Sequence, residues 1–187
     1  DLFRYVDENG NDFDIKAEHI NEYLNQKMEN KYTAKDFRTW AASWKTGARL
    51  AMVSEASEKE ISELPELHRE AVEKSEKDGF PPYVEWCGRY LKGTEGLAKL
   101  AESGNLPGET DKERMATMLA VIDTVAADLG NTRAVCRSSY IRPMFMEDWE
   151  EGVFLDRWNE AKKGQIRGEN MWPDETAAIN YMKKWEE

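Results

Sequence analysis

One stretch of the chain decides its fold: Leu129-Gly130-Asn131-Thr132-Arg133-Ala134-Val135-Cys136-Arg137-Ser138-Ser139-Tyr140-Ile141. Gly130 stands where a helix takes a left-handed C-terminal cap, and Thr132 can cap a new short helix. That helix would contain Cys136 and Arg137 and reach Tyr140. The stretch therefore predicts a tight turn, then a short basic helix that leads to a tyrosine.

Two longer helices are predicted before this turn. Thr110 and Glu113 have the spacing of a capping box, and apolar residues follow at helical spacing: Met115, Met118, Leu119, Ile122, Val125 and Leu129. Upstream, Thr33 can cap a helix that runs through about Val53. Its predicted core-facing residues are Phe37, Trp40, Ala41, Trp44, Ala48 and Ala51.

The remaining chain predicts a short hairpin and further helices. The runs 2–6 and 12–16 flank an Asn-Gly pair, which is a strong signal for a tight turn. We expect the other helices at about 17–28, at 55–80 as one or two pieces broken near Pro65, at 81–104 as two pieces split at Gly93, at 145–163, and at 174–185 with Asp174 as N-cap. The predicted fold class is mainly α with a short N-terminal β-hairpin.

Composition sets broad limits on the function. The chain has 187 residues, of which 40% are hydrophobic and seven are Trp, so it can bury a core as one ordinary domain. It has no apolar run long enough to predict a membrane span, and residues 1–10 lack the layout of a signal peptide. Cys87 and Cys136 form no CxxC pair, and the two His are far apart, which predicts a reducing, cytoplasmic setting and no metal site.

The charge is unevenly distributed. The net charge of −11 is unusual for a DNA-binding protein, because DNA affinity depends on Lys and Arg that neutralise phosphates. Residues 32–50 and residues 131–145 nevertheless carry +3 each, so the rest of the chain carries −17. The two basic stretches can contact phosphate while the acidic remainder faces water. The simpler alternative is an acidic protein with chance basic clusters.

Two segments together resemble the signature boxes of the small type IB DNA topoisomerases, the bacterial and poxviral kind. Residues 33–40 read TAKDFRTW and resemble that family's K-D-[LF]-R-T-[WY] box. Residues 129–141 resemble its L-G-[NH]-T-P-A-V-C-[RK]-x-S-Y box, and Tyr140 follows Asn131 by nine residues, as in the family. The family shares its catalytic fold with the tyrosine recombinases, so the resemblance implies a helical core that breaks and rejoins DNA.

The resemblance also implies which residues act. Tyr140 would attack a phosphodiester, hold the 3′ phosphate and release a 5′ hydroxyl, because breaking a strand without losing its bond energy needs a covalent intermediate. Arg38 would bind the non-bridging oxygens with its planar, charged fork. Asn131 would donate from its amide, and Lys35 would assist at the phosphate. The family needs no metal or other cofactor.

The implied partner is double-stranded DNA, on which the family generally acts as a monomer. Arg133, Arg137 and Arg142 are candidates for contacts with the DNA backbone. The implied activity is the relaxation of supercoils by a cytoplasmic, nucleoid-associated enzyme without a membrane partner.

The chain also departs from the family's pattern. The family uses an upstream arginine and an upstream lysine on a β-hairpin, the lysine as general acid. Because the chain begins after their expected place, we expect a catalytic-domain fragment without its β-rich part that cleaves DNA poorly alone. Residues 55–105 are longer than the family's connection and predict an inserted acidic helical subdomain.

Other interpretations remain open at this stage. Tyr140 can be a core aromatic residue, Arg38 a solvated helix charge, and Asn131 part of a turn after Gly130. The whole chain can be a non-catalytic helical domain, derived from this fold, that binds a protein partner through its acidic surface. A tyrosine recombinase is another alternative, although recombinases usually show a His-x-x-Arg box where this chain has Lys35 and Arg38.

Overall fold

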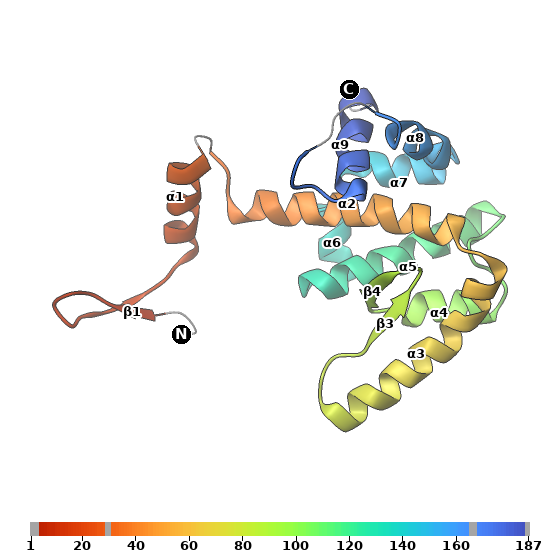
Figure 1. Ribbon diagram of the computed structural model, residues 1–187, viewed down its shortest axis with the longest axis horizontal. Coiled ribbons are helices and arrows are strands. Elements are labelled where there is room, and N and C mark those ends of the chain that lie inside the picture. The colour runs from red at the N-terminus through yellow and green to blue at the C-terminus, as the bar shows by residue number, and fades with distance from the viewer. Residues whose placement is uncertain (1–3, 29–30, 165–167, 186–187) are drawn as a thin grey trace. The chain divides into compact units, whose positions relative to one another are not determined.

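The structure is a computed structural model that describes residues 4–28, 31–164 and 168–185 (Figure 1). The chain forms two compact units, residues 1–39 and 40–187, and each is described by itself. Helix α2 (Ala34–Glu55) begins in the first unit and continues into the second.

The first unit contains the predicted hairpin and helix. Strand β1 (Arg4–Val6) pairs antiparallel with β2 (Asp12–Asp14), and the Asp7 carboxylate accepts hydrogen bonds from two backbone N–H groups of the turn. Residues 2 and 3 of the predicted first strand lie outside the described residues. Helix α1 spans Ala17–Met28, as predicted, and none of its residues is buried.

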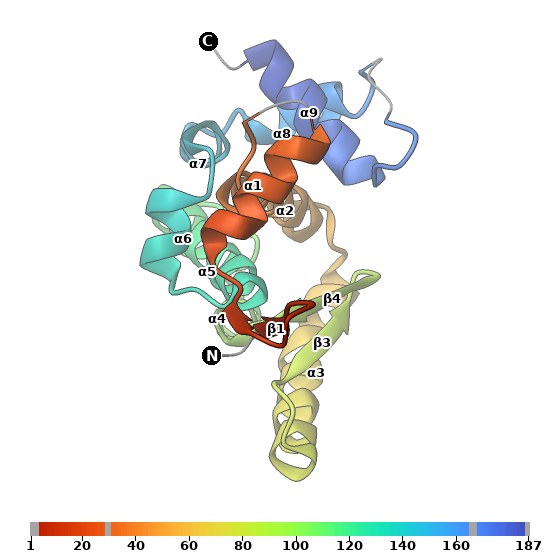
Figure 2. The ribbon, with the colours of Figure 1, turned by 90° about the vertical axis from the view of Figure 1, so that its left-hand side faces the viewer.

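In the second unit, α2 lies between two groups of elements (Figures 1 and 2). On one side are the three C-terminal helices: α7 (Pro143–Glu150), α8 (Phe154–Ala161) and α9 (Pro173–Trp185). On the other side are α3 (Glu58–Asp78), β3 (Tyr83–Trp86), β4 (Arg89–Lys92), α4 (Glu95–Glu102), α5 (Asp111–Leu129) and α6 (Arg133–Ser139). The fold is mainly α, as the sequence predicts.

Helix α2 packs against an aromatic cluster from the C-terminal helices. The rings of Phe145, Phe154, Trp158 and Tyr181 lie with their centroids 5.0–6.5 Å apart. Gly47 lets α2 approach this cluster, because a Cβ atom there would lie 2.7 Å from the Trp158 ring. The predicted core stripe of α2 is therefore largely correct.

Within that stripe, the predicted role of one residue is wrong. Ala48 and Ala51 are buried, and Trp40 and Trp44 pack against the core while half-exposed. Phe37 is instead 45% exposed. Helical spacing identifies the face on which a residue lies, but it does not fix how far the buried part of that face extends along the helix.

The prediction that everything after the first hairpin is helical is also wrong. Strands β3 and β4 form a second antiparallel hairpin in place of the predicted helical piece. Cys87 and Gly88 turn the chain with φ of 47° and 70°, the left-handed values that a two-residue hairpin turn needs. Alternate residues are buried, among them Val84 and Trp86 on β3. Gly93, the predicted break between two helical pieces, separates β4 from α4.

Three predicted helix boundaries need correction. Pro65 does not break α3, which is continuous through it. Instead of one helix over 145–163, α7 and α8 are separated at Gly152, whose φ is 77°. Asp174 is not an N-cap but lies in the first turn of α9, where it pairs with Arg89 at 2.5 Å. The carboxylate of Glu175 instead accepts the backbone N–H that precedes the helix.

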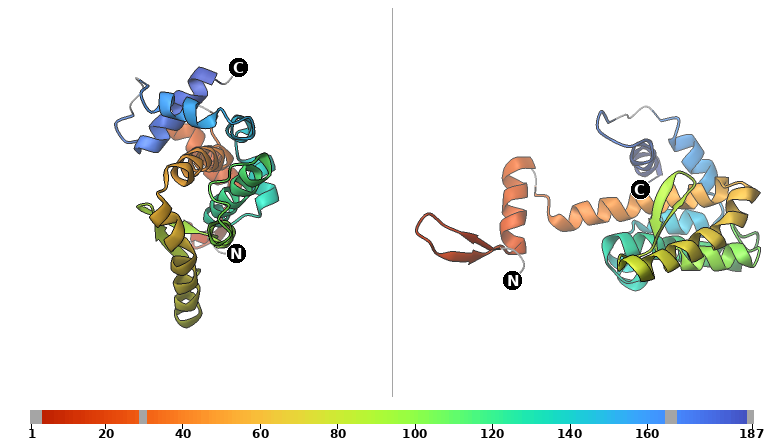
Figure 3. Two further views of the ribbon diagram at one scale, coloured as in Figure 1. Left: turned by 90° about the vertical axis from the view of Figure 1, so that its right-hand side faces the viewer. Right: turned by 60° about the horizontal axis from the view of Figure 1, so that its bottom comes forward.

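The capping predictions around α5 are confirmed. Thr110 and Glu113 form a complete capping box, and Gly130 closes the helix in the left-handed region with φ of 64°. Residues 55–105, the predicted acidic insert, comprise the end of α2 and the elements α3, β3, β4 and α4. Of these, α4 and β4 pack against α5 (Figure 3). These contacts give α5 a fixed support on the side away from the C-terminal helices.

Candidate functional site

The segment that carries Tyr140 is a short helix with defined ends. Thr132 begins α6 with an extended backbone, and its hydroxyl accepts the N–H of Val135 at 3.3 Å, as predicted. Cys136 is fully buried and anchors the middle of the helix. Tyr140 follows the last helical residue and adopts φ of −128°. A seven-residue helix thus separates the Asn131 turn from the tyrosine.

The backbone around Tyr140 is fastened at several points. The N–H groups of Tyr140 and Ile141 both donate to the carbonyl oxygen of Cys136 at 3.1 Å. Ser43 of α2 donates from its hydroxyl to the Tyr140 carbonyl at 3.3 Å, and it accepts the N–H of Arg142 at 3.0 Å. Tyr140 is half-buried and packs against the core. The structure therefore gives this tyrosine a fixed main chain and a partly accessible side chain.

Asn131 lies directly after the cap of α5. Its backbone N–H donates to the Ala126 carbonyl at 2.9 Å, which closes the turn. Its side-chain Nδ2 is buried, and no hydrogen-bond partner for it lies among the residues that the structure describes. A buried amide donor without a partner is uncommon, because leaving it unpaired costs free energy. Among the described residues, the Asn131 amide is thus a buried donor whose hydrogen bond is not formed.

An ion-pair network joins α2 to the end of α5, just before this turn. Asp128 lies 2.7 Å from Lys45 Nζ and 2.6 Å from Arg49 Nη2, and Arg49 Nη1 donates to Thr124 at 3.0 Å. Burial by itself raises the pKa of Asp128, but the two cations outweigh it and hold the pKa below its ordinary value. Lys45 and Arg49 belong to the basic stretch 32–50, which the sequence left open to phosphate contact, and the structure pairs both with Asp128.

The three arginines predicted to contact DNA differ in their surroundings. Arg133 forms a two-point ion pair with Asp123 of α5, with its Nε 2.6 Å from the carboxylate. Arg137 lies 3.6 Å from Glu150. Arg142 is exposed at the start of α7. The basic stretch therefore contains one arginine, Arg133, that fastens α6 to α5 by a two-point ion pair.

Lys35 and Arg38 belong to the first unit, whereas Asn131 and Tyr140 belong to the second. Lys35 is exposed on the first turn of α2, and Arg38 is half-buried. Thr33 donates to the Asp36 carboxylate from its backbone N–H at 2.8 Å and from its hydroxyl at 2.7 Å, which lowers the pKa of Asp36. These bonds fix the start of the helix that carries both cations.

Sequence reasoning missed Ser43, Asp123 and Asp128, which hold the site segments in place. Ser43 lies 97 positions from Tyr140 in the chain, and Asp128 lies 79 positions from Arg49. Residues so far apart in the chain share no local pattern that would predict their contact. A weak signal was present in α2, where Arg49 directly follows Ala48 of the predicted apolar stripe and must find a partner if it is buried.

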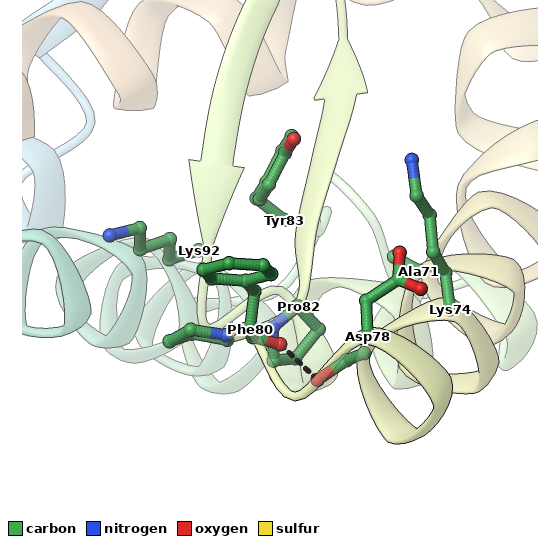
Figure 4. Close-up of a pocket in the computed structure, with 9 residues that line it drawn as sticks. Ala71, Lys74, Asp78, Phe80, Pro82, Tyr83 and Lys92 are labelled. Atoms are coloured by element: carbon green, nitrogen blue, oxygen red, sulfur yellow. Dashed lines mark hydrogen bonds between the residues drawn. The ribbon is translucent and has the colours of Figure 1, made fainter.

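A cavity of about 430 Å³ lies at the end of α3 beside the second hairpin, with Phe80, Tyr83 and Lys92 on its walls (Figure 4). None of the predicted site residues lines it. Among the described residues, no group of His, Cys, Asp and Glu is arranged to hold a metal ion. No described helix is both long and apolar enough to cross a membrane.

Comparison with known families shows which family the chain belongs to. A model of the family "Eukaryotic DNA topoisomerase I, catalytic core" matches residues 1–152. The chain belongs to this family. It is thus related to the type IB DNA topoisomerases, isomerases whose substrate is DNA, and the matched range includes both signature boxes and Tyr140. Comparisons with curated proteins and with solved structures found no match.

Proposed function

We propose that this chain is the nucleophile-bearing part of a type IB DNA topoisomerase and that it relaxes supercoiled DNA through a covalent bond to Tyr140. The observation that carries the proposal is the family match over residues 1–152, which includes every residue that we propose to be catalytic. The structure adds support because Tyr140 ends a capped helix and remains partly accessible.

In the proposed reaction, the Tyr140 phenol loses its proton and its oxygen attacks the phosphorus of one DNA strand. The bond from phosphorus to the 5′ oxygen breaks, the 5′ oxygen takes up a proton, and a 3′-phosphotyrosyl ester remains. The free 5′ end rotates, and the 5′ hydroxyl then attacks the ester to reseal the strand. The covalent ester conserves the energy of the phosphodiester, so no external energy source is needed.

The other proposed catalytic residues stabilise charge on the phosphate. Arg38 would bind two non-bridging oxygens with its guanidinium fork. Asn131 would donate from its Nδ2, which has no hydrogen-bond partner among the described residues, and Lys35 would assist from the first turn of α2. Removing one donor of this kind typically lowers the rate by about 10²–10³-fold. We expect Arg38→Ala and Asn131→Ala to slow cleavage by that order without abolishing DNA binding.

The proposed DNA contacts are made by the arginines nearest Tyr140 in the chain. Arg137 and Arg142 would contact the backbone of double-stranded DNA, and Arg133 would have to exchange its two-point pairing with Asp123 to do so. Each phosphate contact changes the slope of log affinity against log salt by about 0.9. Arg142→Ala should therefore make the slope less steep by about 0.9, the value for one phosphate contact. Arg133→Ala should change the slope least.

A trapping experiment tests the proposal. The intact gene product that carries this chain is incubated in EDTA with duplex DNA labelled at the 5′ end of the cleaved strand, and the mixture is then denatured. We expect a labelled protein adduct that Tyr140→Phe abolishes and that Tyr90→Phe, a change at an exposed tyrosine, leaves intact. An adduct that persists in Tyr140→Phe, or one that forms only with 3′-labelled DNA, would contradict the proposal.

A further inference from the structure

The connection between α6 and α7 consists of Tyr140, Ile141 and Arg142. It leaves one helix and enters the next, so its backbone groups lie where helices lack partners of their own. The Tyr140 carbonyl lies beyond the last turn of α6, and the Arg142 N–H precedes α7. Ile141 is buried, which draws the middle of the connection against the core. The polar groups on either side of Ile141 therefore need partners from elsewhere in the protein.

Ser43 supplies both of these partners. Its side chain is on the middle of α2, and the residue is only 1% exposed. The hydroxyl donates its one proton to the Tyr140 carbonyl and accepts the Arg142 N–H, at 3.3 Å and 3.0 Å. One small side chain thus bonds to the main chain on both sides of Ile141.

We propose that Ser43 is a positioning residue for the Tyr140 nucleophile: its hydroxyl fixes the main chain of the tyrosine to α2, and so fixes where the phenol oxygen can reach. This inference rests on the proposed function. Attack on phosphorus requires the oxygen to be close and aligned, and a misplacement of about 1 Å can lower the rate by about 10²-fold. In this proposal Ser43 acts only through the main chain on both sides of Ile141.

The surrounding contacts explain why Ser43 matters more than its neighbours. The bonds from Tyr140 and Ile141 to Cys136 fix the start of the connection, but both end on the same carbonyl of α6. They hold the tyrosine to its own helix only. The two bonds of Ser43, by contrast, tie this connection to α2. Arg133 and buried Cys136 hold the body of α6, so loss of the Ser43 bonds would loosen chiefly the connection that carries Tyr140.

The same helix offers matched controls. Ser54 is a half-buried serine of α2 whose hydroxyl donates to the Leu50 carbonyl at 3.0 Å, within its own helix. Thr46 is fully buried and donates to the Ala42 carbonyl at 2.8 Å, also within the helix. Ser54→Ala removes a hydroxyl of the same kind from the same helix, and Thr46→Ser changes a buried position while keeping its hydroxyl.

The test measures single-turnover cleavage by the intact gene product at saturating DNA, across pH 6–9. We expect Ser43→Ala to lower the cleavage rate constant by about 10–100-fold, by the same factor at every pH, with DNA affinity changed less than twofold. Ser43→Thr keeps the hydroxyl and should recover most of the rate, and Ser54→Ala and Thr46→Ser should cleave at the wild-type rate. Thermal melting of each variant shows whether it is folded.

The results separate this inference from the proposed function. If Tyr140→Phe abolishes the adduct but Ser43→Ala cleaves within twofold of wild type, the role of Ser43 is wrong and the proposed function stands. If Tyr140→Phe still forms the adduct, the proposed function itself fails. A loss in Ser43→Ala that Ser54→Ala matches, or that comes with an equal loss of DNA affinity, also overturns the positioning role. If Ser43→Ala does not fold, Ser43→Thr decides, because a folded, hydroxyl-bearing variant without near-wild-type cleavage overturns it too.

Discussion

The ion pair between Asp128 and Arg49 should control the stability of the second unit. Only 7% of the Arg49 side chain and 14% of the Asp128 side chain are exposed. The carboxylate also lies 2.7 Å from Lys45, so one acidic group serves two cations of α2. The substitution Asp128→Asn keeps the shape of the side chain and removes its charge, which leaves Arg49 buried without a counterion.

The expected loss of stability depends on the interactions that Arg49 keeps in the Asp128→Asn variant. Removing one partner of a buried ion pair costs about 3–5 kcal/mol, because the remaining charge is left uncompensated. Arg49 keeps its hydrogen bond to Thr124, and an asparagine at position 128 keeps one oxygen that can accept. We therefore expect Asp128→Asn to lower the free energy of unfolding by about 2–3 kcal/mol.

Asp123→Asn is the matched control. Asp123 lies on the same helix and also pairs with an arginine, Arg133, but the two side chains are 27% and 48% exposed. Exposed pairs contribute about 0–1 kcal/mol. Urea denaturation followed by tryptophan fluorescence measures both variants. The reasoning is refuted if Asp128→Asn costs no more than Asp123→Asn. Replacing both Asp128 and Arg49 by apolar residues should recover most of the loss, because no charge then stays buried.

The same pair predicts a dependence on pH. Burial by itself raises the pKa of Asp128, but Arg49 and Lys45 lower it below its ordinary value of 3.8. A carboxyl group with a lowered pKa in the folded state stabilises the protein above its unfolded pKa of about 3.9, and that contribution is lost as the pH falls through the folded value. The difference in stability between wild type and Asp128→Asn should therefore shrink below about pH 4.

Three further predictions concern the core of the second unit. Gly47→Ala should lower the free energy of unfolding by about 1 kcal/mol, because overpacking against Trp158 costs about 1–3 kcal/mol and the gain in helix propensity is about 1 kcal/mol. Urea denaturation measures this change, and a variant more stable than wild type would contradict the prediction. Burial, with a nearby acid, raises the pKa of Cys87 to about 11, so iodoacetamide at pH 8 should alkylate it about 100-fold more slowly than a free thiol, as timed mass spectrometry can show. Burial and the hydrogen bond to Asp148 raise the pKa of Tyr181. Tyr181→Phe should therefore lower the free energy of unfolding by about 1–3 kcal/mol at pH 7. The difference in stability from wild type should close above about pH 10, because the tyrosine of the unfolded wild-type chain ionises there, and denaturation at both pH values measures this.

Local sequence signals predicted the parts of the fold that local interactions determine. The capping box at Thr110 and the glycine cap at Gly130 each involve residues a few positions apart, so the sequence alone identifies them. The first hairpin has an Asn-Gly turn, and its prediction is confirmed. The second hairpin turns at Cys87 and Gly88, and cysteine has no preference for left-handed backbone. Its apolar residues fit helical spacing as readily as alternation, so sequence reasoning took it for a helix.

The candidate site also has residues that the local sequence predicts and contacts that it does not. Tyr140, Asn131 and Arg38 stand in short motifs, so resemblance to a family is enough to propose them from the sequence alone. The contacts that hold two of these residues come from the distant helix α2, where Ser43 reaches the tyrosine connection and Arg49 reaches the helix before the asparagine turn. Such pairs depend on tertiary packing, and the local sequence carries at most a weak signal of them, as at Arg49 beside the apolar stripe of α2.

The number of charged residues in a stretch does not show what each charge does in the folded protein. The two basic stretches of the sequence look equivalent, and each carries +3. In the folded unit, Lys45, Arg49 and Arg133 are paired with two aspartates of α5, so part of this charge holds α2 and α6 in place. The same net charge can therefore come from cations with a structural role and from cations that could meet DNA. The proposed function assigns contact with the DNA backbone to Arg137 and Arg142, which lie three residues before and two residues after Tyr140.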